Sequence, residues 1–216
     1  RLAETAAANG VGLNPLLQDP WMAIHPPLIF IGYALLAVPF CYSVGALLDR
    51  PQDAAWLENA RPWGLAAWGF LGAGIFVGGY WAYKVLGWGG YWGWDPVENS
   101  SLVPWLIGGV FLHVLRAARV RRTVLPVTHL AAIFAFSLAL YGTFLTRSGI
   151  LGDFSVHSFS GTSLSLSLAA ATGIVTTAAL LLLLIRGKCL PEGDLYPAHD
   201  SREFFLLLGA LLLVFA

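Results

Sequence analysis

The sequence predicts an all-α, polytopic helical membrane protein, and three observations lead to that fold class. Hydrophobic residues make up 57% of the 216-residue chain and charged residues only 11%. The mean hydropathy of +0.71 is too high for a soluble domain of this length. The apolar residues form continuous runs of about 20, the length that a helix needs to cross a bilayer, and short polar segments separate these runs.

Five runs are long enough for complete transmembrane helices, and a truncated sixth begins near Phe204. The five span residues 27–48, 63–83, 97–115, 124–145 and 163–185. Because no basic segment with a short apolar run precedes the polar start at Arg1, we expect a piece of a longer protein. We expect residues 1–216 to form a single membrane domain.

The basic residues predict which loops face the cytoplasm. Nine of the 12 lysines and arginines lie in alternate loops, and positively charged loops stay on the cytoplasmic side. These nine are Arg50, Arg61, Arg116, Arg119, Arg121, Arg122, Arg186, Lys188 and Arg202. The outer side then carries the segment around His25, an aromatic segment at 80–99 and a loop at 146–162.

Charge and cysteine usage exclude two classes of function. The chain has 12 acidic and 12 basic residues and no nucleic-acid-binding motif, so a nucleic-acid partner is excluded. Cys41 and Cys189 stand alone, outside any CxxC or CxxCH motif. We therefore expect neither a disulfide framework nor a cofactor attached covalently to this chain.

Aromatic residues are unusually dense in the 80–99 segment. Three of the nine tryptophans, Trp88, Trp92 and Trp94, lie within seven positions and are interleaved with glycines. An interfacial aromatic belt explains tryptophans at the membrane surface, but it would scatter them over several helix ends. Glycines in one compact segment permit close approach to a flat partner, and large rings with a polar N–H suit a planar apolar ligand.

The end of this segment has the pattern of a helix start. Asp95 is a favoured N-cap residue, Pro96 is favoured at the first helical position, and Glu98 completes a capping box. We expect Asp95 to act chiefly as a cap and thereby to fix the shape of the aromatic segment.

Two histidines fall on the same side of the membrane as the aromatic segment. His25 precedes Pro26-Pro27, a pair that fits the first turn of a helix, so we expect it at the outer mouth of the first span. His157 follows Arg147 in the outer loop. Imidazole is a common axial ligand of heme iron, and Arg147 could pair with a propionate. Taken alone, either histidine is better explained as a hydrogen-bonded interfacial residue, but their coincidence with the aromatic segment reverses that preference.

His113 differs from these two because it lies inside the third predicted span. It follows Pro96 by 17 residues, which places it about 25 Å along the helix, in the cytoplasmic half. An intramembrane ionisable residue is a functional candidate: it could bind a second, buried heme, or it could simply hydrogen-bond a neighbouring helix. We expect no other histidine at matching depth, so the second iron ligand would lie outside this sequence. His129 and His199 are expected on the cytoplasmic side and are assigned to no ligand.

The run from Trp88 to Asn99 resembles the tryptophan-rich "WWD" signature of heme-handling proteins in cytochrome c biogenesis. The flanking segments narrow the resemblance. His25-Pro-Pro upstream and the segment from Thr143 to Phe159 downstream are similar to the CcmF-type heme lyase family, or to its nitrite-reductase-associated counterpart. The similarity covers essentially the whole chain.

The resemblance implies two heme sites. At the outer site, His25 and His157 would be the axial ligands of the iron, with the tryptophan segment under the porphyrin. A separate heme b would sit in the membrane on His113, with its second ligand in a later span. Asp153-Phe154 departs from the family's slightly shorter run and changes the expected geometry of the loop.

The resemblance also implies a function, partners and a location. The protein would take heme from a periplasmic heme chaperone and present it to the CxxCH motif of apocytochrome c for thioether attachment. It would work with other maturation subunits, such as CcmH-like proteins, at the periplasmic face of the bacterial inner membrane. No side chain in the outer loops is identified as a catalytic nucleophile or base.

Three other functions compete with this one. A heme transporter would need polar residues along a path, whereas the spans are nearly free of charge. A b-type electron-transfer cytochrome would need two histidines at one depth on facing helices. A structural subunit without a cofactor would leave the tryptophans and the outer histidines unexplained.

Overall fold

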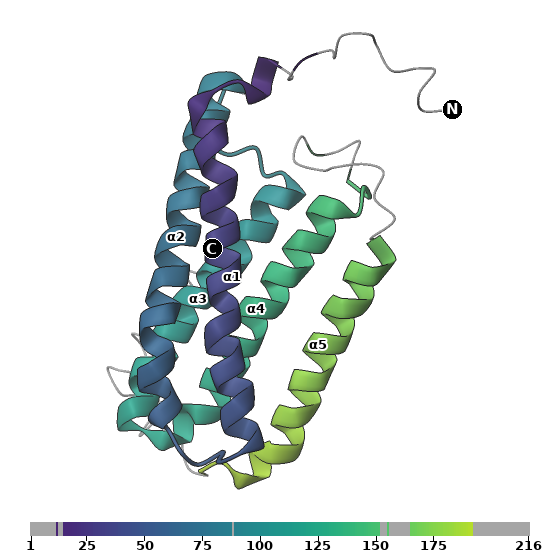
Figure 1. Ribbon diagram of the computed structural model, residues 1–216. Helices are drawn as coiled ribbons and strands as arrows, with labels where there is room; N and C mark the ends of the chain where they lie inside the picture. The colour runs from purple at the N-terminus through teal and green to yellow at the C-terminus, as the bar shows by residue number, and fades with distance from the viewer. Residues whose placement is uncertain (1–11, 13–14, 88, 152–154, 156–164, 192–216) are drawn as a thin grey trace.

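The computed structural model describes residues 12, 15–87, 89–151, 155 and 165–191, which form a bundle of five long helices (Figure 1). The long helices are α1 (Pro20–Leu48), α2 (Ala55–Val85), α3 (Pro96–Val120), α4 (Leu125–Arg147) and α5 (Ser165–Arg186). Three 3-10 turns accompany them: η1 (Pro15–Leu17), η2 (Arg122–Val124) and η3 (Gly187–Cys189). Each long helix is long and apolar enough to cross a membrane. Five spans and an all-α fold are therefore confirmed, and the sixth run lies outside the described residues.

The helices α1 to α4 form the packed part of the bundle. The most extensive contact joins α1 to α2, and α4 packs against both α3 and α1. Helix α5 lies at one edge, against α4 (Figure 1), and among its residues only Ala179 is buried. Its last residue, Arg186, ties it to α1, because the guanidinium Nε donates to the Leu47 carbonyl oxygen at 2.9 Å.

The helices extend beyond the predicted spans. Helix α1 begins at Pro20 rather than at residue 27, and α2 begins at Ala55 rather than at 63. A span prediction counts only the apolar run that fills the hydrocarbon core. A helix can continue into the polar interface as long as its backbone hydrogen bonds are satisfied.

The start of α1 corrects the expectation about Pro26-Pro27. Asp19 caps the helix, with its carboxylate Oδ1 accepting from the Trp21 N–H at 2.9 Å, and Pro20 takes the first helical position. Pro26 and Pro27 therefore lie inside α1 and not in its first turn. An aspartate followed by proline offers a side-chain cap and a preset φ angle, so the helix starts there. Prolines further along are tolerated in membrane helices because neighbouring groups compensate for the lost bonds.

Asp19 also joins the start of α1 to the end of α2. Its carboxylate lies 3.1 Å from the Lys84 ammonium, and the Trp21 ring packs edge-on against Tyr80 with ring centroids 5.1 Å apart. The Trp21 N–H and, to a lesser degree, Lys84 hold the pKa of Asp19 below its usual value.

His129 is the most deeply buried titratable side chain at the opposite end of the bundle. It is 0% exposed, its Nδ1 lies 2.8 Å from the Ser43 hydroxyl, and its ring stacks on Trp56 with centroids 4.7 Å apart. His129 thus links α4 to α1 and α2.

The structure corrects the expected depth of His129. Its neighbour Thr128 donates to the carbonyl of Val114 at 3.3 Å, so His129 lies near the depth of His113. The expectation that no other histidine lies at the depth of His113 is wrong. Helix α3 continues to Val120, and the short turn η2 leads directly into α4, so the first residues of α4 lie beside the last turns of α3. The two side chains have different surroundings, since His113 is exposed on α3 and His129 is enclosed.

We predict that Ser43→Ala destabilises the bundle and that Ser137→Ala does not. Removing the Ser43 hydroxyl deprives a buried imidazole of its partner, which costs about 1–3 kcal/mol in free energy of unfolding. The hydroxyl of Ser137 is buried without a hydrogen-bond partner among the described residues, so its removal is neutral or slightly stabilising. Equilibrium unfolding of the purified protein in mixed micelles checks both; equal effects would contradict the assigned role of the Ser43–His129 bond.

Candidate functional site

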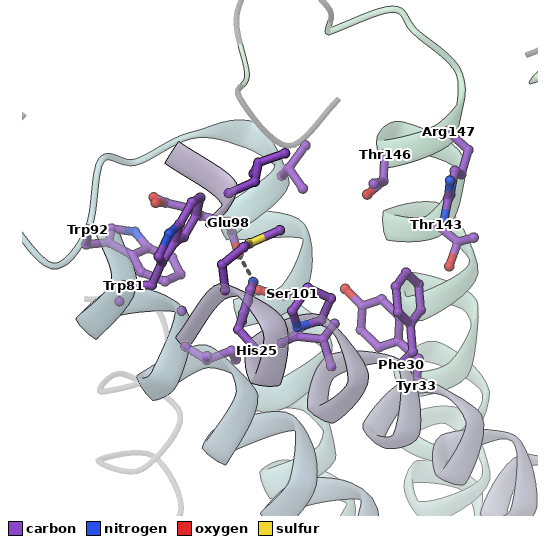
Figure 2. Close-up of a pocket in the computed structure, with 18 residues that line it drawn as sticks. His25, Phe30, Tyr33, Trp81, Trp92, Glu98, Ser101, Thr143, Thr146 and Arg147 are labelled. Atoms are coloured by element: carbon purple, nitrogen blue, oxygen red, sulfur yellow. Dashed lines mark hydrogen bonds between the residues drawn. The ribbon is translucent and has the colours of Figure 1, made fainter. Parts of the chain in front are cut away.

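A cavity of about 280 Å³ opens at the end of the bundle where α1 and α3 begin and α2 and α4 end (Figure 2). Its size is near the lower end of the range for small-molecule sites. Most of its lining is apolar or aromatic, with a few polar groups. The lining residues are Leu17, Met22, His25, Pro26, Ile29, Phe30, Tyr33, Ile75, Gly78, Gly79, Trp81, Trp92, Val97, Glu98, Ser101, Thr143, Thr146 and Arg147.

His25 lies in this cavity in a defined orientation. Its Nδ1 is 2.7 Å from the carbonyl oxygen of Gly74 on α2. A carbonyl can only accept, so Nδ1 carries the proton, and in the neutral ring the lone pair lies on Nε2. Histidines that bind metals almost always donate their other ring N–H to a carbonyl or carboxylate in this way.

Two tryptophans line the same side of the cavity as His25 (Figure 2). Trp81 is 2% exposed; its indole N–H donates to the Leu16 carbonyl at 3.2 Å, and its ring is nearly parallel to that of His25, with centroids 6.5 Å apart. The indole nitrogen of Trp92 is buried and has no hydrogen-bond partner within the part of the chain that the structure describes. The cavity therefore offers aromatic surface beside the imidazole.

Helix α4 supplies the opposite side of the cavity. Thr143, Thr146 and Arg147 face it from the last turns of α4 (Figure 2). Arg147 is the one basic residue among the described lining residues, and guanidinium groups bind carboxylates through paired hydrogen bonds. An apolar ligand with an acidic edge would thus meet apolar walls and a cation at the rim.

The described rings of the tryptophan-rich segment do not lie in one plane. Helices α2 and α3 take up its two ends, so only residues 86–95 of the predicted 80–99 segment lie between helices. Trp92 lines the cavity, whereas Trp94 is 73% exposed, and their rings are nearly perpendicular at 88°. Trp94 has φ of +56°, a left-handed conformation that is uncommon outside glycine. Its carbonyl accepts from the Asn99 amide at 3.2 Å.

Asp95 caps α3 as predicted. Its Oδ1 accepts from the Val97 N–H at 2.9 Å, and the Glu98 carboxylate accepts from the N–H groups of Asp95 and Gly93, at 3.2 and 2.9 Å. The other carboxylate oxygen of Asp95, Oδ2, accepts from the Ser155 hydroxyl at 2.7 Å in a buried hydrogen bond. Asp95 therefore joins the tryptophan-rich segment to Ser155, which follows α4 in the sequence, a link that the capping pattern alone could not predict.

The structure brings together some of the predicted site residues and not others. His25, Trp92 and Arg147 line one cavity. His113 lies on α3 away from it, with its Nδ1 donating to the Gly109 carbonyl at 2.7 Å. Trp88 and His157 lie outside the described residues.

Trp81 and Tyr33 are among the lining residues that sequence reasoning missed. Trp81 belongs to the last turns of α2 and precedes the glycine-interleaved pattern, so nothing in the sequence separated it from an interfacial tryptophan. Tyr33 follows His25 by eight residues on α1. Its hydroxyl donates to the Ser100 carbonyl at 3.2 Å. Its spacing from His25 along α1 was the available signal, because residues seven to eight apart share a helix face.

Comparison with known proteins relates this site to one family. The family model "Cytochrome C assembly protein" matches residues 1–152. The chain is 44% identical to the cytochrome c-type biogenesis protein ccl1 of Rhodobacter capsulatus, over 99% of this chain and 32% of that protein. It is 45% identical to the cytochrome c-type biogenesis protein CcmF of Pseudomonas aeruginosa, over 98% of this chain and 32% of that protein.

A solved structure of the cytochrome c heme lyase CcmF is similar in fold. It matches with a TM-score of 0.69 and 39% identity, over 90% of this chain and 29% of that chain. The chain thus spans about a third of the length of the curated relatives it matches. The extent of the family match and the identity to these relatives show that the chain belongs to the cytochrome c assembly protein family, as a member of the CcmF type.

Proposed function

We propose that this chain is the heme-holding core of a heme lyase in cytochrome c biogenesis. It holds heme in the cavity at the His25 end and presents it to the CxxCH cysteines of apocytochrome c. One observation carries the proposal: an imidazole lies in a cavity with aromatic walls, and its Nδ1 proton is donated to the Gly74 carbonyl. That arrangement leaves Nε2 as the nitrogen with a lone pair for iron.

The lining residues fit a porphyrin. Aromatic and aliphatic side chains suit the apolar macrocycle, and Arg147 suits a propionate. The cavity is only partly enclosed, which leaves part of the bound group accessible to a second protein.

His157 is the proposed second axial ligand of the outer heme. It lies outside the described residues, but Ser155 is two residues before it in the sequence and is hydrogen-bonded to Asp95. Asp95 caps the helix whose first two turns contribute Val97, Glu98 and Ser101 to the cavity. The Asp95–Ser155 bond therefore places Ser155, two residues before His157 in the sequence, beside the start of α3, and this supports the proposal.

In this reaction the protein's main contribution is to bind heme and to orient it toward the cysteine thiols. In thioether formation a cysteine S–H adds across a vinyl double bond of heme, with the sulfur going to one carbon and the hydrogen to the other. Fixing the porphyrin edge against the CxxCH thiols lowers the entropic cost of this addition. The proposed partners are a periplasmic heme chaperone, apocytochrome c and other maturation subunits, at the periplasmic face of the bacterial inner membrane.

His113 is proposed to bind a second, buried heme b. Its side chain is exposed on α3 and its Nδ1 donates to the Gly109 carbonyl, so the tautomer again has its lone pair on Nε2. The second ligand would come from a part of the full-length protein outside this sequence.

We predict that His25→Ala and His157→Ala in the full-length protein each remove the outer heme and leave a b-type spectrum. His113→Ala should remove only the buried heme, because its surroundings are separate from the cavity. Reduced-minus-oxidised spectra and pyridine hemochrome assays on protein purified in mild detergent measure the two populations. Unchanged heme content in all three variants would refute both sites.

We predict that Arg147→Gln weakens retention of the outer heme by about tenfold, since a hydrogen bond to a charged group contributes about 1.5–3 kcal/mol and this one is at an exposed rim. Arg147→Lys should fall between the wild type and the glutamine variant because lysine keeps the charge without the paired geometry. Heme loss to excess apomyoglobin measures retention. Wild-type retention in Arg147→Gln would exclude Arg147 as a heme contact.

A further inference from the structure

Two glycines on α2 lie in close contact with α1. Gly74 and Gly78 are four residues apart, so they share one face of the helix, and small residues at this spacing let membrane helices approach closely. A Cβ added at Gly74 would lie 2.9 Å from the backbone nitrogen of Ile29 on α1. The backbone of α1 thus packs directly on Gly74.

His25 lies one turn before Ile29, and its ring occupies the space above Gly78. A Cβ added at Gly78 would lie 2.5 Å from both Nδ1 and Cε1 of His25. The three atoms nearest to that Cβ all belong to the imidazole. The ring therefore takes the space that a side chain at position 78 would need.

The same face of α2 fixes the direction of the imidazole. The carbonyl of Gly74 accepts from Nδ1 at 2.7 Å, and the ring of Trp81, three residues after Gly78, is inclined to it by only 15°. One nitrogen is thus bound to the backbone of α2, and the plane of the ring follows from the position of α2.

We propose that Gly74 and Gly78 are positioning residues for heme ligation by His25, an inference that rests on the proposed function. The Gly74 carbonyl selects the Nδ1–H tautomer, and the bare Cα of Gly78 lets the ring reach that carbonyl while Nε2 serves the iron. A carbonyl that accepts a hydrogen bond from a metal-binding histidine orients the ring and raises its basicity. The packing of α1 on α2 therefore sets the position and the tautomer of the proposed heme ligand.

A purely structural role for these glycines predicts a different result. If they serve only helix packing, any added methyl on the α1–α2 contact should act alike. Gly32 on α1 offers the comparison, because a Cβ there would lie 2.7 Å from the Leu71 Cβ and 2.8 Å from its Cα. Gly69 on α2 has nothing within 4 Å of an added Cβ and controls for the methyl itself.

The test introduces Gly78→Ala, Gly32→Ala and Gly69→Ala into the full-length protein, with His25→Ala beside them. To reach ordinary contact with the new methyl, the His25 ring must move by about 1 Å, which breaks a 2.7 Å hydrogen bond. Outer heme per folded protein, its spin state and its midpoint potential are measured after gel filtration.

We expect Gly78→Ala to weaken retention of the outer heme by about 10- to 100-fold. The heme that remains should shift toward high spin and a higher midpoint potential. Gly32→Ala should lower the folded yield without changing the spectrum of the folded fraction, and Gly69→Ala should match the wild type. A wild-type spectrum in Gly78→Ala, or the same spectral change in Gly32→Ala, would overturn the proposal.

Two further comparisons complete the test. If His25→Ala keeps the outer heme, the proposed function fails; if His25→Ala loses it while Gly78→Ala keeps it unaltered, only the positioning role fails. Should Gly78→Ala not fold, the double variant His25→Ala/Gly78→Ala decides, because it removes the ring from the methyl. Recovered folding supports the contact, and continued misfolding contradicts it.

Discussion

The close approach of α1 to α2 is the constraint on which the cavity depends. Gly32 rests against the backbone of Leu71, and Gly74 rests against the backbone of Ile29. Because the glycines themselves contribute no side chain at these points, the backbones come close enough for a polar group on one helix to bond the backbone of the other. His25 uses this to reach the Gly74 carbonyl.

The same approach brings the beginning of α1 and the end of α2 together outside the cavity. Asp19 meets Lys84 there, and the indole of Trp81 reaches the carbonyl of Leu16. These contacts close the side of the cavity that lies next to His25. The remaining side belongs to α4, which contacts α1 less extensively than α2 does and lines the cavity with Arg147.

Asp95 is the second point at which separate segments meet. One carboxylate oxygen accepts from an N–H in the first turn of α3, and the other accepts from the Ser155 hydroxyl beyond α4. A single side chain thus couples the end of the tryptophan-rich segment to a loop that is 60 residues further along the chain. Its charge is satisfied by hydrogen bonds on both sides, which is how a 9% exposed carboxylate is accommodated.

Much of this arrangement could be predicted from the sequence, since each apolar run is long enough to identify a span and the Asp95-Pro96 pattern identifies a cap. Pro26-Pro27 was misleading because proline fits both a first turn and the interior of a membrane helix, and Asp19-Pro20 decided between them. The depth of His129 depended on where α3 ended, which hydropathy does not mark. The bond from His25 to Gly74 and the bond from Ser155 to Asp95 join distant segments, so no local pattern reveals them.

The most direct test of the account is a cryo-EM structure of the full-length protein purified with heme. The account predicts a porphyrin between α1 and α4, with iron on Nε2 of His25 and Nδ1 still hydrogen-bonded to the Gly74 carbonyl. A porphyrin bound elsewhere at this end of the bundle, or one in the cavity without His25 on its iron, would contradict it.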